Sequence, residues 1–242
     1  MSTETTWCGF RREDFEFEGH KCILVHPDTP RAGRPWVWRA EFFDAFAQAD
    51  EAMAREGYFV AYVGLSDRYG CPSAVEDMEA FRKMLVEKYN LADRPHIFGF
   101  SRGGLYAVNY ALTYPQHTGK LYLDAPVLDI RSWPGGKGRG VGAEKCWQEC
   151  LACYGLTEES ARRFDRNPLD RAEELARLNI PVVLVAGGAD RTVPYAENGQ
   201  PFAARFRRAG GNIMLIVKPT CDHHPHSLED PAPIVAFLTK GE

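Results

Sequence analysis

A serine set among glycines is the position best equipped for nucleophilic chemistry in this chain. The run Gly99–Gly103 (GFSRG) matches the pattern G-x-S-x-G, and a third glycine follows at Gly104. In this pattern the serine occupies a sharp turn that exposes its hydroxyl, and the glycines let a strand and a helix approach closely. Ser101 is therefore the candidate nucleophile, and the backbone N–H of Arg102 is a candidate oxyanion donor. The alternative interpretation is a serine that only caps a helix after a tight turn.

A serine hydroxyl also requires a base within hydrogen-bond reach and an acid that orients the base. Two later loops offer them, in the order Ser, Asp, His that accompanies the G-x-S-x-G turn. Asp190 lies in GGADRTVP after the apolar run 181–186, and His223 lies in PTCDHHPH after the apolar run 212–218. Sites in open α/β sheets form at such carboxyl ends of strands. We therefore expect a catalytic triad of Ser101, Asp190 and His223.

Other residues compete for two of these roles. His224 and His226 follow His223 in the same loop and are alternative bases. If His223 is the base, we expect them to line the substrate pocket. Asp124, which follows another apolar run (LYLDAP), is an alternative acid, whereas Asp222 adjoins the base and is badly placed to reach its imidazole.

Short β-rich runs alternate with segments of helical periodicity along the chain. Apolar strands without alternation are typical of a parallel sheet that is buried on both faces. The order predicts an α/β fold with a mostly parallel, doubly wound sheet. The predicted strands are 21–26, 58–64, 95–100, 120–125, 181–186 and 212–218, and the predicted helices are 40–55, 74–89, 103–114, 199–209 and 233–238.

One segment, 127–179, separates two predicted strands by more than a crossover helix requires. We expect a single domain over 1–242 with this segment inserted as a helical lid or cap. Helical pieces are predicted around 144–154 and 157–164. The glycine-rich run 135–142 is not a phosphate-binding loop, because no strand precedes it and it lacks the terminal Gly-Lys-Ser/Thr. A flexible loop at the mouth of a site is the better interpretation.

A second oxyanion donor is expected from the loop after the run 21–26. This loop lacks a His-Gly-Gly pattern, so the backbone N–H groups near 28–29 and 36–38 are equal candidates. Trp38 is expected to form a wall of the substrate pocket. The alternative for Trp38 is a packed position at the start of a helix.

These motifs together resemble those of the α/β-hydrolase superfamily over about residues 20 to 240. The resemblance rests on His26-Pro27, GFSRGG at the nucleophile turn, GGADRTVP at the acid turn and PTCDHHPH at the base turn. Within the superfamily the chain is most similar to the prolyl-oligopeptidase-like and carbohydrate-esterase-like branch. The resemblance implies the α/β-hydrolase fold and a base at His223, although Thr220 and Asp222 stand where glycines are common in the superfamily. It also marks Asp124 as a place where some members carry the acid.

The composition of the chain argues against nucleic acids and membranes as binding partners. The 29 Lys and Arg residues against 33 Asp and Glu give a net charge of −4, without the basic excess of nucleic-acid-binding proteins. No run approaches the ~20 apolar residues of a membrane span. We expect a cytoplasmic protein that binds neither nucleic acid nor membranes, although a signal peptide already removed would leave no trace. The sequence leaves the oligomeric state open.

The seven cysteines are odd in number and sparse, which favours packed free thiols over a disulfide framework. Cys146, Cys150 and Cys153 share one helical face, but a second ligand pair at structural-zinc spacing is missing. A nicotinamide-binding fold is disfavoured because no G-x-G-x-x-G opens the first βα unit. We therefore expect neither a metal nor a cofactor.

The expected function is hydrolysis of a small-molecule carboxylic ester through an acyl-enzyme. The loops around the motifs are rich in Trp, Arg, His and Tyr, which suits a short acyl group on a carbohydrate or polar aryl alcohol. A peptidase or amidase on the same triad is the first alternative. The second is a catalytically silent binding protein, because fold alone does not establish function.

Overall fold

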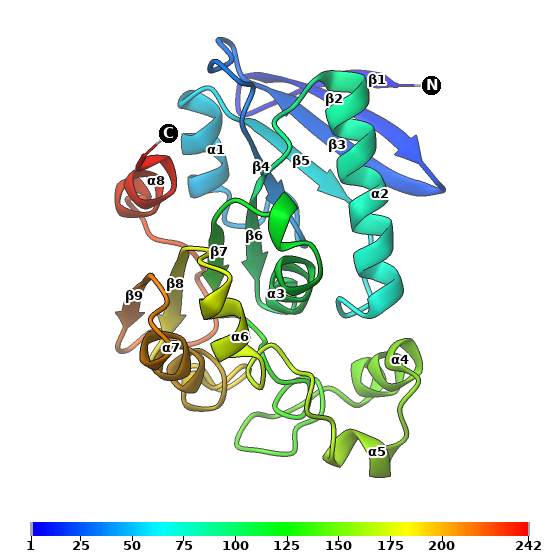
Figure 1. The fold of residues 1–242 in the computed structure, drawn as a ribbon, viewed down its shortest axis with the longest axis vertical. Coiled ribbons are helices and arrows are strands. Elements are labelled where there is room, and N and C mark those ends of the chain that lie inside the picture. Colours follow the sequence, from blue (N-terminus) through cyan, green and yellow to red (C-terminus); the bar gives the residue numbers. More distant parts are fainter. Residues whose placement is uncertain (1, 242) are drawn as a thin grey trace.

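Within residues 2–241, which the computed structural model describes, the strands form one sheet in the order β1-β2-β3-β5-β4-β6-β7-β8-β9 (Figure 1). In this spatial order the strands from β5 through β4 to β9 run parallel to one another. At one edge, β1, β2 and β3 pair antiparallel, and β3 is also antiparallel to β5. The predicted α/β-hydrolase fold with a mostly parallel sheet is confirmed. The strands are β1 (Thr3–Trp7), β2 (Phe10–Phe17), β3 (His20–His26), β4 (Trp36–Arg39), β5 (Phe59–Val63), β6 (His96–Phe100), β7 (Leu121–Asp124), β8 (Val182–Gly187) and β9 (Ile213–Lys218).

Helices cover both faces of the sheet. Apolar side chains of α1 and α8 pack with one face, and those of α2, α3, α6 and α7 pack with the other (Figure 1). In the described part of the chain, no helix is long and apolar enough to cross a membrane. The helices are α1 (Gln48–Arg55), α2 (Pro72–Tyr89), α3 (Gly103–Thr113), α4 (Glu144–Tyr154), α5 (Glu158–Arg162), α6 (Ala172–Arg177), α7 (Gly199–Arg208) and α8 (Ala232–Thr239).

The N-terminal hairpin was not predicted from the sequence. β1 and β2 are joined at Cys8 and Gly9, whose φ angles of 49° and 88° suit a tight hairpin turn. Most side chains of β1 are exposed and polar, so hydrophobic patterning gives little signal there. Trp7 and Phe10, beside the turn, are buried in the core, and Phe15 and Phe17 of β2 are partly buried against it.

The region 36–47 also differs from the prediction. The sequence predicts a helix over 40–55 and no strand directly before it, but Trp36–Arg39 is strand β4, and α1 begins only at Gln48. The buried guanidinium of Arg39 explains the difference, because it donates to the backbone carbonyl oxygens of Glu41, Phe42 and Ala45. Carbonyls held by a side chain are not free to form a helix there. The result is an irregular loop directly after β4.

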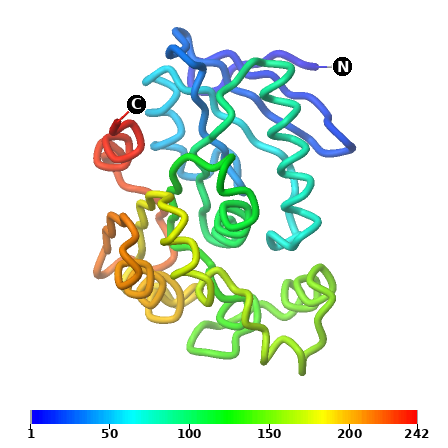
Figure 2. Tube along the Cα trace, in the orientation of Figure 1, coloured from blue at the N-terminus to red at the C-terminus, as the bar shows by residue number. Residues whose placement is uncertain are grey.

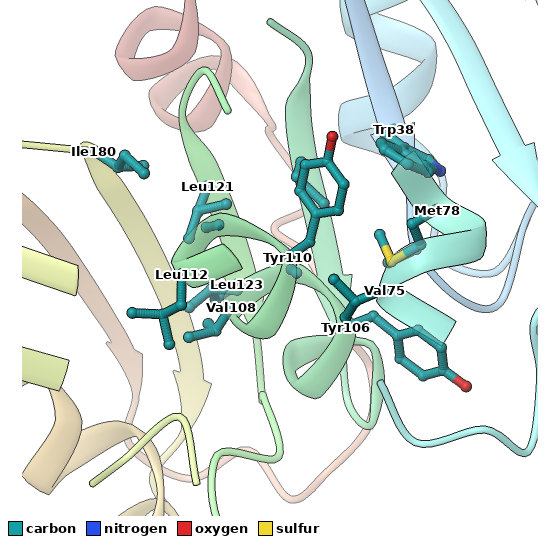
Figure 3. Close-up of a cluster of buried hydrophobic side chains, with 14 of the residues drawn as sticks. Trp38, Val75, Met78, Tyr106, Val108, Tyr110, Leu112, Leu121, Leu123 and Ile180 are labelled. Atoms are coloured by element: carbon teal, nitrogen blue, oxygen red, sulfur yellow. The ribbon is translucent and has the colours of Figure 1, made fainter. Parts of the chain in front are cut away.

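Trp38 does not line a pocket, and the prediction that it forms a substrate wall is wrong. It points into the core between β4 and the helices α2 and α3 (Figure 3). Its ring lies 5.6 Å from the ring of Phe81 and 5.2 Å from that of Tyr110, measured between centroids, and it is fully buried. An aromatic residue inside a central parallel strand is buried on either face, which sequence spacing alone did not reveal.

The chain between β7 and β8 divides into two parts. α6 joins the helices that cover the sheet, whereas α4 and α5 lie beyond the carboxyl ends of the strands (Figure 2). Apolar side chains of α4 and α5 belong to a separate buried cluster. In it, Trp147, Cys150 and Ala161 pack with Tyr69 and Val127. The cysteines of α4 are free thiols. This second part is therefore anchored by packing to the loops that follow β5 and β7.

Replacement of Trp38 by alanine is expected to lower the free energy of unfolding by about 3–5 kcal/mol, because it empties a large buried volume. Val141→Ala, at a position that is 78% exposed, is the control and should change stability by less than about 0.5 kcal/mol. Urea denaturation followed by circular dichroism measures both. A stability loss equal to that of the control would contradict the core position of Trp38.

Candidate active site

Ser101 lies at the turn between β6 and α3 with a φ of 49°. This left-handed backbone is rare for residues other than glycine and is retained only where neighbouring structure enforces it. Its N–H donates to the Asp124 carbonyl at 2.9 Å, and its own carbonyl accepts from Val127 at 2.8 Å and Gly104 at 3.0 Å. The strained turn is thus held from strand β7 and from the chain that follows it.

The glycines around Ser101 are required to different degrees. A Cβ at Gly99 would lie 2.8 Å from the carbonyl oxygen of Gly103, and one at Gly104 would lie 2.6 Å from Cβ of Pro126. A Cβ at Gly103 would meet Cβ of Glu41 at a milder 3.3 Å. Close approach of strand, helix and the loop after β7 therefore depends most on Gly99 and Gly104.

The structure brings the three predicted triad residues together. His223 Nε2 lies 3.0 Å from Ser101 Oγ, and His223 Nδ1 lies 2.7 Å from Asp190 Oδ2. The other carboxylate oxygen of Asp190 accepts from the backbone N–H groups of Thr192 at 2.9 Å and Val193 at 2.8 Å. Asp190 and His223 are both buried. This carboxylate is thus fixed in the orientation that leaves Nε2 of His223 facing the serine.

The loops that carry Asp190 and His223 are joined directly. The Asp222 carboxylate accepts from the backbone N–H of Arg191 at 3.0 Å and from its side chain at 2.8 Å. It also accepts from the backbone N–H of His223 at 2.8 Å. These donors, those of Arg191 first, lower the pKa of Asp222 to about 2. A side chain at Gly187 would collide with the backbone of Asp222, which explains a glycine at the last position of β8.

The carboxylate of Asp124 is hydrogen-bonded to His226 and not to His223. Its Oδ1 lies 2.9 Å from Nδ1 of His226, and its Oδ2 accepts from Tyr122 Oη at 2.6 Å and from the Ser227 N–H at 2.9 Å. Both Asp124 and His226 are buried. The site therefore contains a second His–Asp pair beside the first, which sequence reasoning did not predict. The partners are 102 positions apart, and no local pattern connects them.

A small cavity opens at Ser101. Its volume is about 180 Å³, and its lining divides into an apolar side from the β4–α1 loop and β6 and an imidazole side from the base loop. His224 is exposed and stacks on the ring of Phe46 with 5.5 Å between centroids. The lining residues are Phe42, Ala45, Phe46, Phe100, Ser101, His223, His224 and His226.

The loop after β4 lies against the nucleophile turn. Glu41 is buried there and accepts from Arg102 Nε at 2.7 Å, while Arg102 also binds Asp67 at 2.7 Å. Burial raises the pKa of Glu41, and the charge of Arg102 opposes that rise. The ion pair ties the β4–α1 loop to the residue that follows the nucleophile. The backbone N–H of Arg102 stands at the start of α3, where a helix leaves its first N–H groups unpaired.

The positions predicted for the second oxyanion donor are wrong. Residues 36–38 lie inside β4, whose backbone pairs with β5 and β6. Thr29 lies beside Gly57, just before β5 begins. It is therefore at the amino ends of the parallel strands, whereas Ser101 is at their carboxyl ends. The loop that reaches the nucleophile follows β4, not β3. Recognition of Trp36–Arg39 as a strand would have identified it.

Comparisons with known proteins relate this chain to hydrolases. The model of the prolyl oligopeptidase family matches residues 67–240, a stretch that includes Ser101, Asp190 and His223. Over 107 residues the chain is 35% identical to a 2-hydroxy-6-oxononadienedioate/2-hydroxy-6-oxononatrienedioate hydrolase of Paraburkholderia phymatum. That match covers 42% of this chain and 34% of the relative, so the chain spans about a third of that protein's length.

Gly104→Ala is expected to destabilise the protein by about 1–3 kcal/mol, because the added methyl group has no room beside Pro126. Gly103→Ala is the matched control: its contact is milder, and alanine favours a helix over glycine by up to about 1 kcal/mol. Thermal unfolding of both variants tests the difference. Equal stabilities would show that the turn does not depend on the close approach at Gly104.

Proposed function

The chain belongs to the prolyl oligopeptidase family of α/β-fold serine hydrolases, and we propose that it cleaves a carboxylic ester through an acyl-enzyme on Ser101. The observation that carries this proposal is the continuous hydrogen-bonded chain from Ser101 to His223 to Asp190, at 3.0 and 2.7 Å. Such a chain allows the imidazole to accept the serine proton while the carboxylate stabilises the imidazolium that forms.

In the proposed acylation step, Ser101 Oγ attacks the ester carbonyl carbon as its proton passes to His223 Nε2. The bond to the alcohol oxygen then breaks, and His223 returns the proton to the leaving alcohol. A water molecule repeats the sequence on the acyl-enzyme and releases the carboxylic acid. Atoms and protons balance over the two steps without any further reactant.

The developing oxyanion is proposed to accept from two backbone N–H groups. The first is that of Arg102, at the positive end of α3. The second comes from the loop after β4, at Phe42, which borders the same cavity as Ser101. The Glu41–Arg102 ion pair holds the two donors at a fixed separation, because it joins their two segments.

The acyl group is proposed to be short. A cavity of about 180 Å³ has room for a few carbon atoms and not for a long chain, and Ala45, Phe46 and Phe100 give it an apolar side. The matched relative is named for hydrolysis of 2-hydroxy-6-oxononadienedioate, which supports a small-molecule substrate. A carbohydrate or polar aryl alcohol is the proposed leaving group.

We propose that 127–179 acts as a cap over this site. Tyr69 connects the two: its ring lies 5.8 Å from the Arg102 guanidinium and 6.3 Å from the ring of Trp133, and its hydroxyl donates to Glu149 on α4 at 2.7 Å. Motion of α4 would therefore reach the residue beside the nucleophile through Tyr69.

Ser101→Ala is expected to reduce turnover of short p-nitrophenyl esters by about 10⁴-fold or more, since removal of a triad member normally costs that much. Ser73→Ala, at an exposed serine outside the site, is the control. Mass analysis after reaction with a fluorophosphonate probe should give one adduct, on Ser101. A loss of less than about tenfold, or an adduct elsewhere, would overturn the assignment of the nucleophile.

Peptide or amide hydrolysis is the second candidate, because the family is named for peptidases. Initial rates on acetyl esters and on aminoacyl amides with the same chromogenic leaving group separate the two. We expect the ester to react faster relative to its spontaneous hydrolysis. Faster amide turnover on the same corrected scale would reverse the proposal while leaving the triad intact.

A further inference from the structure

Three imidazoles meet at the mouth of the active-site cavity. One ring nitrogen from each of His223, His224 and His226 lies within 4.8 Å of those of the other two. Ring centroids are 4.9 Å apart for His223 and His224 and 4.8 Å for each of the other two pairs. All three line the cavity at Ser101. The triad requires only one of these histidines, so the other two call for an explanation.

Two of the imidazoles have the hydrogen bonding of metal ligands. Nδ1 of His223 is bonded to Asp190 and Nδ1 of His226 is bonded to Asp124, so Nε2 of His223 faces Ser101 Oγ and Nε2 of His226 is left for another partner. A histidine that binds a metal nearly always makes such a bond through its other ring nitrogen, which fixes the ring and raises its basicity. The two buried carboxylates would also offset the charge of a divalent cation.

His224 supplies a third, adjustable donor. The centroid of its ring lies 4.9 Å from that of His223 and 4.8 Å from that of His226. The neutral ring is the form that binds a metal. The His224 side chain is exposed, whereas the His223 and His226 rings are buried. Zn–N bonds of about 2.0–2.1 Å place two ligand nitrogens of a tetrahedral ion about 3.4 Å apart. The ring nitrogens, which lie within 4.8 Å of one another, must therefore approach by up to about 1.4 Å when the ion binds.

We propose that His223, His224 and His226 bind a divalent transition metal ion such as Zn²⁺, and that the bound ion blocks hydrolysis. Three neutral imidazoles suit Zn²⁺, Ni²⁺ or Cu²⁺ rather than Mg²⁺ or Ca²⁺. The ion takes the lone pair of His223 Nε2, which then cannot accept the proton of Ser101. The fourth position of a tetrahedral ion is left for water. The inhibitory part rests on the proposed function, whereas the binding part does not.

Calorimetric titration of ZnCl₂ tests binding without reference to turnover. The protein is the Ser101→Ala, Cys221→Ser double variant, since Cys221 lies beside His224 in the base loop and its thiol would compete for zinc. We expect one site, and adding His224→Gln should weaken it by at least about tenfold, as changes around metal sites commonly do. Adding His20→Gln, remote from the cluster, is the matched control and should leave the affinity unchanged.

Inhibition is measured separately, as the rate of fluorophosphonate labelling with and without Zn²⁺. The wild-type protein and the His224→Gln variant are each compared with their own metal-free rate. We expect Zn²⁺ to suppress labelling, EDTA to restore it, and His224→Gln to shift the inhibitory concentration upward by about the same factor as binding. Equal zinc affinity in the parent and the His224→Gln variant would overturn the proposal. Labelling that is absent without metal would instead overturn the proposed function and leave the binding result standing.

Discussion

The left-handed backbone of Ser101 constrains the whole carboxyl edge of the sheet. A φ of 49° at a residue with a Cβ is maintained only while its N–H and carbonyl are held by bonds to Asp124, Gly104 and Val127. Those bonds require β6 and β7 to pair with Phe100 opposite Asp124. A slip of this register would move both the Asp124 carbonyl, which accepts from the Ser101 N–H, and the Val127 N–H, which donates to the Ser101 carbonyl. The position of the Ser101 hydroxyl at the cavity is therefore a consequence of strand pairing and not of the turn alone.

Asp124 extends this constraint to the base loop. Its backbone carbonyl holds the nucleophile turn, and its carboxylate holds His226 and the Ser227 N–H, so one residue at the end of β7 fixes both sides of the site. The acid loop is held in a similar way, through Asp222 and Arg191. The residue that sequence reasoning weighed as a rival acid thus positions two neighbours of the base.

The features that were predictable from the sequence have local signals, whereas the features that were missed depend on contacts that leave no local pattern. The turn at Ser101 was predictable because local sterics demand glycine at Gly99 and Gly104, and the meeting of Asp190 and His223 was predictable because strand ends in a parallel sheet meet at one edge. The loop after β4 was not, because the apolar spacing of residues 40–47 is helical while the buried Arg39 holds their carbonyls. The pairing of His226 with Asp124 likewise has no local signature.

The two histidine–carboxylate pairs show how closely the requirements of a general base and of a metal ligand coincide. A base needs an imidazole whose Nδ1 is fixed by a carboxylate and whose Nε2 lone pair faces the reacting group, and a zinc ligand needs the same. A second such pair, 4.8 Å away between centroids, offers its lone pair to the same cavity. His224 adds a third imidazole to this cavity, so the proposed metal site and the proposed general base share one loop.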